Sequence, residues 1–174
     1  VNVLSFEADV FRLYFCNFKA MKHVYMASSH DGKNFRYEGT CLDTGHMVND
    51  VKKLMVKGQS CYLMALHANT DRLWYAMSGD GRRFGPEQEL ASSLGNEDKY
   101  IVAIGWVTDG PKLRGFLYGA GAVPELNRNR IFARWLQKRI SITDQENQTY
   151  EATAGLGHDR QLISLKGRKE FEGR

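Results

Sequence analysis

A seven-residue phrase occurs twice in this chain, and this repeat limits the possible folds more than any other feature of the sequence. Residues 29–35 and 78–84 both read Ser-x-Asp-Gly-x-x-Phe, and the two copies are 49 residues apart. The residues before them also match, since 23–27 aligns with 72–76. Asp-Gly pairs favour tight hairpin turns because both residues tolerate positive φ. The chain is therefore predicted to contain two copies of one hairpin-based unit.

Each unit reads as four short strands joined by turns. The expected strands cover residues 3–6, 10–18, 23–28 and about 35–38 in the first unit, and 51–56, 60–67, 72–77 and about 84–90 in the second. Repeats of roughly 40–50 residues with this content are typical of β-propellers, whose blades are four-stranded antiparallel sheets. The predicted fold class is therefore all-β, of the β-propeller type.

A third, longer unit is expected to follow. Its first two strands would cover 100–107 and 112–118, and an inserted loop at 119–127 would precede a long strand from about 130 to 143. The repeated phrase returns in altered form at 144–150, where Asn replaces Gly and Tyr replaces Phe. Asn is the usual substitute for Gly at positive φ. The second strands of the three units are expected to align through residues 12–16, 60–64 and 114–118.

This count gives an incomplete ring. The predicted blades cover about residues 1–47, 48–95 and 96–157, and residues 158–174 would form the first strand of a further blade or a closing strand. Natural propellers typically have at least four blades. An open end would expose an apolar blade face and unpaired strand edges. We therefore expect the ring to be completed by another copy in a homo-oligomer or by the remainder of a larger chain.

The rest of the composition excludes several classes of function. No segment approaches the roughly 18 consecutive apolar residues of a membrane-spanning helix, so no membrane role is predicted. The cysteines and histidines lack metal-site spacing and no nucleotide-binding loop is recognised, so neither a metal nor another cofactor is predicted. The net charge of +4 leaves nucleic-acid binding through the basic segment 128–139 as a minor hypothesis. A strand with one solvated face explains that segment better.

The aspartates of the repeated phrase are interpreted as turn residues rather than as catalytic groups. The side chains of Asp31 and Asp80 can accept hydrogen bonds from backbone N–H groups of their own turns. Phe35 and Phe84 are expected to fill the gap between neighbouring blades.

The same residues carry a resemblance to a known superfamily. A second strand of the Arg-Leu-Tyr-Phe kind at 12–15, a third strand ending in Ala and Ser, and then Ser-x-Asp-Gly-x-x-Phe resemble the blades of five-bladed propeller glycosidases. This superfamily includes arabinanases, β-xylosidases, fructosidases and mannoside phosphorylases, and the resemblance covers about residues 1–150. It implies an axial funnel in which acidic residues at the start of the innermost strands act as general acid and as base or nucleophile.

The resemblance implies a set of candidate site residues. Asp50 matches the position of the nucleophile or base, Asp98 that of an orienting acid, and Glu97 beside it is the candidate general acid. Three further residues are candidates for substrate binding, namely His46, Trp106 and Asp159. The alternative role for Asp50 and Asp98 is turn capping, and the alternative for Trp106 is filling the core.

Two hypotheses of function follow. The first is a carbohydrate-active propeller that is similar to glycoside hydrolases and cleaves or binds a glycan, by hydrolysis or phosphorolysis where it is an enzyme. The second is a non-catalytic module that binds a glycan or a protein and completes its ring by oligomerisation. Fold alone does not decide between them.

Overall fold

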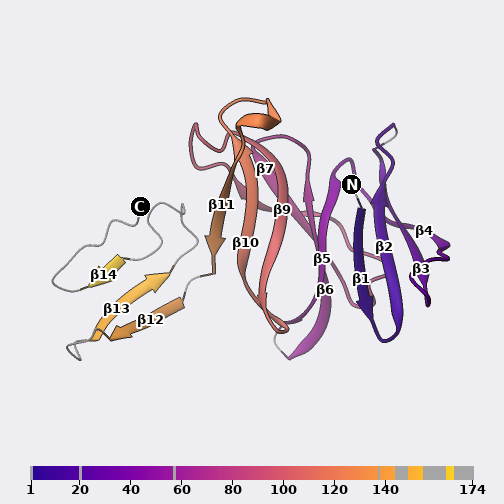
Figure 1. Cartoon of the computed structure of the whole chain (residues 1–174), viewed down its shortest axis with the longest axis horizontal. Helices are drawn as coiled ribbons and strands as arrows, with labels where there is room; N and C mark the ends of the chain where they lie inside the picture. Colours follow the sequence, from indigo (N-terminus) through magenta and orange to yellow (C-terminus); the bar gives the residue numbers. More distant parts are fainter. Residues whose placement is uncertain are drawn as a thin grey trace.

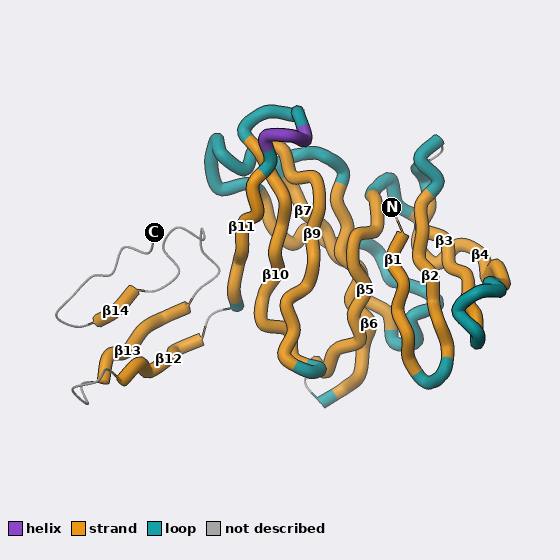
Figure 2. Tube along the Cα trace, viewed as in Figure 1, coloured by secondary structure: helices purple, strands orange, loops and turns teal. Residues whose placement is uncertain are grey.

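The computed structural model describes residues 2–19, 21–56, 58–136, 138–143, 149–154 and 164–166. Within these ranges the regular structure consists of β-strands and one short 3₁₀ turn, η1 (Leu126–Arg128) (Figures 1 and 2). The strands are β1 (Asn2–Glu7), β2 (Val10–Cys16), β3 (His23–Ser29), β4 (Arg36–Asp43), β5 (Met47–Val56), β6 (Gln59–His67), β7 (Arg72–Ser78), β8 (Gln88–Ser92), β9 (Tyr100–Asp109), β10 (Lys112–Gly121), β11 (Arg130–Trp135), β12 (Lys138–Thr143), β13 (Thr149–Ala154) and β14 (Ser164–Lys166). Across the described ranges no helix is long and apolar enough to span a membrane.

The strands form antiparallel sheets in chain order. The first sheet has the order β1-β2-β3-β4, the second β5-β6-β7-β8, and the third β9-β10-β11. Strands β12, β13 and β14 pair with one another in a further sheet. Figure 1 shows the first three sheets following one another across the molecule without closing into a ring. The chain is thus an all-β partial propeller, and the predicted fold class is confirmed.

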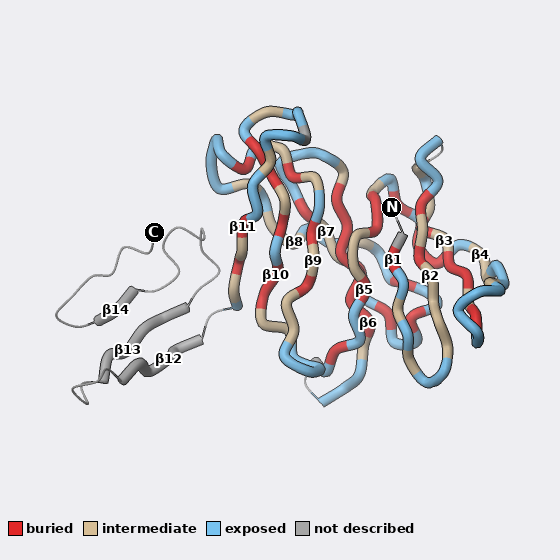
Figure 3. Tube along the Cα trace, viewed as in Figure 1, coloured by how far each residue is buried: buried red, intermediate tan, exposed pale blue. Residues whose placement is uncertain are grey.

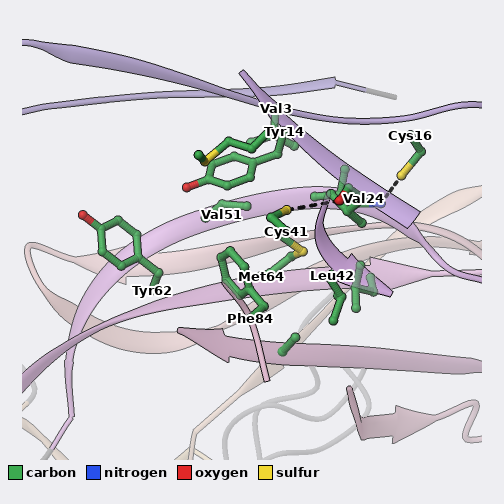
Figure 4. Packing of buried hydrophobic residues seen from close by; sticks show 14 residues of the cluster. Val3, Tyr14, Cys16, Val24, Cys41, Leu42, Val51, Tyr62, Met64 and Phe84 are labelled. Carbon is green, nitrogen blue, oxygen red and sulfur yellow. Dashed lines mark hydrogen bonds between the residues drawn. The ribbon is translucent and has the colours of Figure 1, made fainter. Parts of the chain in front are cut away.

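Two apolar layers hold the first three sheets together. Side chains alternate between the two faces of a strand, so each sheet can bury both faces. Tyr14 and Val24 of the first sheet pack with Met64 of the second (Figure 4). Leu63 and Leu73, on the opposite face of the second sheet, pack against the third. Figure 3 shows the buried residues gathered along the strands where these sheets face one another.

The turns of the first two units lie where the sequence predicts them. Ala8 and Asp9 both have positive φ, at 48° and 60°, as a tight β1–β2 hairpin requires. Gly32 and Gly81 of the repeated phrase also have positive φ, at 68° and 72°. Each strand expected in the first two units has a counterpart, but two bounds differ. β4 extends to Asp43, well beyond the short strand predicted there, and β8 covers Gln88–Ser92 rather than about 84–90.

The prediction of one long strand at about 130–143 is wrong. β11 ends at Trp135 and pairs with β10, whereas β12 begins at Lys138 and pairs with β13. β11 pairs with β10 from Arg130 to Trp135, and the amide of Leu136 donates one further hydrogen bond to the carbonyl of Arg114 at 2.8 Å. β10 begins at Lys112, only two residues before Arg114, so a longer β11 would run past the end of its partner. Of the phrase expected at 144–150, residues 144–148 lie outside the described residues, and the last two residues begin β13.

The predicted alignment of the second strands is also wrong. Ser29 and Ser78 are equivalent residues of the repeated phrase, and they pair with Phe11 and Tyr62 respectively. Phe11, not Tyr14, is therefore the counterpart of Tyr62. The connection between β2 and β3 is longer than that between β6 and β7, and this difference shifts the second strands relative to the third.

Candidate functional site

The repeated phrase forms a closed hydrogen-bonded turn in both copies. In the first copy, Ser29 Oγ accepts a hydrogen bond from the amide of Gly32 at 3.0 Å, and Asp31 Oδ1 accepts from Asn34 and Lys33 at 2.8 and 2.9 Å. The second copy repeats this pattern around Ser78 and Asp80. The backbone N–H groups stabilise the charged carboxylates and lower the pKa of Asp31 and of Asp80. The turn-forming role of both aspartates is confirmed.

Phe84 fills the space between the first and second sheets, as expected. Its ring is buried and meets Tyr14 edge-on, with centroids 5.9 Å apart, and its amide donates to the carbonyl of Cys41 at 2.9 Å. Phe35, its counterpart in the first sheet, is only half-buried. In the second unit, the repeated phrase therefore connects the second sheet to the first.

Asp50 lies at the meeting of two edge strands. A register irregularity between Val48 and Asp50 precedes it in β5. Its side chain is 15% exposed, and Oδ2 accepts a hydrogen bond from the amide of Trp106 at 2.9 Å. Because β9 pairs with β10 on its other side, this contact joins the inner edges of the second and third sheets. Oδ1 lies 3.4 Å from the ammonium of Lys52.

Asp98 has different surroundings, because its side chain is completely buried. Its carboxylate accepts hydrogen bonds from the amides of Leu94 and Gly95, both at 3.0 Å, and from the hydroxyl of Tyr118 at 2.8 Å. The guanidinium of Arg134 lies 3.4 Å away and donates to the carbonyl of Ser92. Burial raises the pKa of Tyr118 to about 12. These contacts agree with the alternative role of Asp98, which is to cap a turn.

The basic segment 128–139 is likewise partly internal, at Arg134. Arg134 is buried, and its guanidinium lies 5.1 Å from the centre of the Tyr118 ring. Arg130 is exposed and lies 3.8 Å from the carboxylate of Glu97. Arg134 therefore belongs to the Asp98 cluster and is not part of a basic surface stripe.

The remaining candidates divide between core and surface. Glu97 is exposed on the turn before β9. Trp106 is buried, and its indole N–H donates to the carbonyl of Leu63 at 3.2 Å, which fits the core-filling alternative. Asp159 lies outside the described residues. Neither Asp98 nor Trp106 presents its side chain at the surface.

His46 belongs to a cluster that sequence reasoning missed. Its Nδ1 lies 2.8 Å from a carboxylate oxygen of Glu87, which also accepts a hydrogen bond from the hydroxyl of Thr44. Its ring stacks on Trp74 with centroids 3.8 Å apart. These residues hold the β4–β5 connection against the second sheet. No spacing in the sequence connects residues 41 positions apart, so only the fold reveals this pair.

An open hollow of about 510 Å³ lies between the β6–β7 and β8–β9 connections, and its lining includes Asn69, Asp71, Asn96 and Tyr100. Within the described ranges, no three His, Cys, Asp or Glu side chains come together as a metal site would require.

Solved structures with a similar fold include a β-fructofuranosidase and a β-1,2-mannobiose phosphorylase. The β-fructofuranosidase of Bombyx mori matches with a TM-score of 0.53 and 17% identity over 87% of this chain and 42% of that enzyme. A mutant of it with bound sucrose matches with a TM-score of 0.51 and 16% identity over 86% of this chain and 41% of that one. The β-1,2-mannobiose phosphorylase of Listeria innocua, with bound β-1,2-mannobiose, gives 0.55 and 16% over 94% of this chain and 55% of that one.

These matches concern the fold. The chain spans about two fifths of the first enzyme and a little over half of the second. No protein-family model matches the chain. No curated protein sequence matches it. The resemblance to propeller glycosidases and phosphorylases expected from the sequence is confirmed at the level of architecture.

Proposed function

We propose that this chain is a carbohydrate-active propeller that binds a glycan at the inner edge of its sheets, with Asp50 as the acidic group of the site. The observation that carries the proposal is the likeness in fold to two enzymes whose structures hold sucrose and β-1,2-mannobiose. Because fold does not determine function, the chemistry must come from specific residues.

Asp50 has the features that a sugar-binding carboxylate needs. It lies on β5, the first strand of its sheet, and remains partly accessible to solvent. The amide of Trp106 fixes Oδ2, so the carboxylate is oriented before a ligand arrives. Oδ1 is positioned beside Lys52 and can accept a hydrogen bond from a sugar hydroxyl, or act as a base or nucleophile.

Cleavage of a glycosidic bond requires a second carboxyl group, about 5–9.5 Å from the first. Glu97 is accessible beside Arg130, but it precedes β9, whereas Asp50 contacts Trp106 six residues after the first residue of that strand. At about 3.3 Å per residue, about 20 Å of strand separates the two acids, which is too far for this pair. Asp98 lies at the same end of β9 as Glu97 and is held there by four donors. The complete burial of Asp98 favours the second candidate function, a module that binds a glycan without cleaving it.

The proposal is tested with Asp50→Asn and the matched control Asp9→Asn. Asn keeps a carbonyl oxygen for the amide of Trp106, and it tolerates the positive φ of the exposed Asp9 turn. Binding is measured by calorimetry against β-fructosides, β-1,2-mannobiose and a panel of plant and microbial oligosaccharides. Turnover is measured on the same sugars with and without phosphate.

We expect the native chain to bind at least one of these sugars, and Asp50→Asn to weaken binding by about tenfold or more, since a hydrogen bond to a charged group is lost. Asp9→Asn should bind as the native chain does. Turnover that Asp50→Asn abolishes would establish the enzyme, whereas binding without turnover would establish the module. Absence of binding to every sugar, or equal binding by Asp50→Asn, would refute the proposal.

A further inference from the structure

The outer face of the first sheet carries an aromatic surface. Side chains alternate along β1, so Val3 contacts the second sheet while Leu4 and Phe6 lie on the opposite face. Leu4 is 57% exposed, Phe6 59%, and Tyr37 on β4 60%. Ring contacts connect this face across three strands, at 5.7 Å between Phe15 and Tyr25 and at 6.1 Å between Tyr25 and Tyr37. Contiguous exposed apolar side chains of this kind mark interaction surfaces.

In the second sheet, the equivalent face is buried against the preceding sheet. Leu4, Leu13 and Ala27 pair in one row across the first sheet. The equivalent row in the second sheet is Val51, Met64 and Ala76, and all three residues are buried against the first sheet. Leu4 is 57% exposed, whereas its counterpart Val51 is 3% exposed. The face that is open on the first sheet is therefore the face by which the second sheet packs on its predecessor.

The third sheet presents the opposite kind of surface. Its inner face buries Phe116 and Tyr118 against the second sheet. The alternating residues form two uncharged rows on the outer face, Gly105, Leu117 and Ala133, and Ala103, Gly119 and Ile131. Ile131 is 78% exposed and Leu117 41%. Ala103, Gly119 and Ala133 leave shallow space beside these two side chains, and large aromatic rings can fill such space. Gly105 lies at the edge of this face, where an added Cβ would be 4.0 Å from the carboxylate of Asp50.

We propose that two copies of this chain associate head to tail, with the outer face of the first sheet of one copy packed on the outer face of the third sheet of the other. This contact continues the order in which the second sheet follows the first and the third follows the second. The first three sheets of two copies make six, and natural rings have about four to eight blades. The inference does not depend on sugar binding.

The test measures the mass of the particle by sedimentation over a wide concentration range. Leu4→Glu places a charge on one face, Ile131→Lys places a charge on the other, and Leu94→Glu is the control, because Leu94 is exposed at 51% in the β8–β9 connection. Thermal unfolding of each variant shows that the fold is retained, and Tyr37→Asp provides an independent change on the first face.

The native chain and Leu94→Glu should form dimers. Leu4→Glu, Tyr37→Asp and Ile131→Lys should each raise the dissociation constant of the dimer by about 100-fold, because an unpaired charge enters an apolar interface. A mixture of Leu4→Glu with Ile131→Lys should restore dimers, since one interface is then native and the other joins opposite charges. A monomeric native chain would overturn the proposal. So would a dimer that Ile131→Lys leaves intact, because that outcome would indicate self-pairing of the aromatic face.

Discussion

The hydroxyl of Tyr14 in the first sheet donates a hydrogen bond to the backbone carbonyl of Gly81 in the second, at 2.8 Å. Gly81 belongs to the second copy of the repeated phrase, so the turn of one unit is tied to the sheet of the preceding unit. Tyr14 is completely buried, and burial raises the pKa of its phenol, which keeps the hydroxyl protonated as a donor. The phrase that closes a hairpin therefore also joins two sheets.

Tyr14→Phe should lower the free energy of unfolding by about 1–2 kcal/mol, because the buried carbonyl of Gly81 loses its donor while the ring is retained. Urea unfolding gives this value. Tyr100→Phe makes the same chemical change on a half-buried side chain beside the open hollow and should change stability by less than about 0.5 kcal/mol. Equal effects of the two variants would contradict a structural role for the contact.

Gly81→Ala should be more costly, at about 2–3 kcal/mol. Its φ is +72°, and an added Cβ would lie 3.1 Å from Tyr14 Oη and from two ring atoms of Tyr62. Gly79→Ala, two residues earlier in the same phrase, adds a methyl group where no atom lies within 4 Å. It should leave the urea midpoint within the error of the native value, and a large loss there would show that the phrase is sensitive for another reason.

Much of the fold could be predicted because the signals are local. Asp-Gly turns and alternating apolar residues are read directly from neighbouring residues, and they gave the sheets of the first two units. Strand pairing is different, because it depends on groups far apart in the chain. The break after Trp135 occurs where the pairing with β10 ends, and the shift of Phe11 against Tyr62 depends on the length of a loop. Neither feature can be predicted from the types of the residues concerned.

Asp98→Asn tests whether this carboxylate holds the β8–β9 connection. The change leaves the guanidinium of Arg134 buried without its charged partner and sets an amide nitrogen against amide donors. We expect a loss of about 3–5 kcal/mol in the free energy of unfolding. Glu97→Gln, the adjacent exposed acid, should cost less than about 1 kcal/mol. If Asp98→Asn were as stable as Glu97→Gln, Asp98 would be free for another role.

The candidate site was only partly accessible to sequence reasoning. Asp50 could be selected because an acidic residue stands at the start of an apolar strand pattern. Its partner is a backbone amide 56 positions away, at Trp106, and every residue type except proline offers that group. The pairing of His46 with Glu87 was missed for a related reason, since the two residues meet only after the β4–β5 connection folds against the second sheet.

His67 makes stability depend on pH. Its side chain is buried, donates from Nδ1 to Asn49 Oδ1, and burial lowers its pKa from 6.5 to about 4. On acidification the unfolded chain therefore takes up a proton near pH 6.5, before the folded chain does. Stability is full above this pH and is lost as the pH falls toward 4. Between pH 6.5 and 5 the free energy of unfolding should fall by about 1.5–2 kcal/mol.

Urea unfolding of the native chain, His67→Gln and His30→Gln at several pH values in this window measures the effect. The introduced glutamine amide can still donate to Asn49 but does not titrate, so the decline should largely disappear in His67→Gln. His30 is exposed, and His30→Gln should retain the native decline. The slope identifies the titrating group, because a merely destabilised variant would shift all values equally and keep the dependence on pH. A decline that persisted in His67→Gln would assign the proton uptake to another residue.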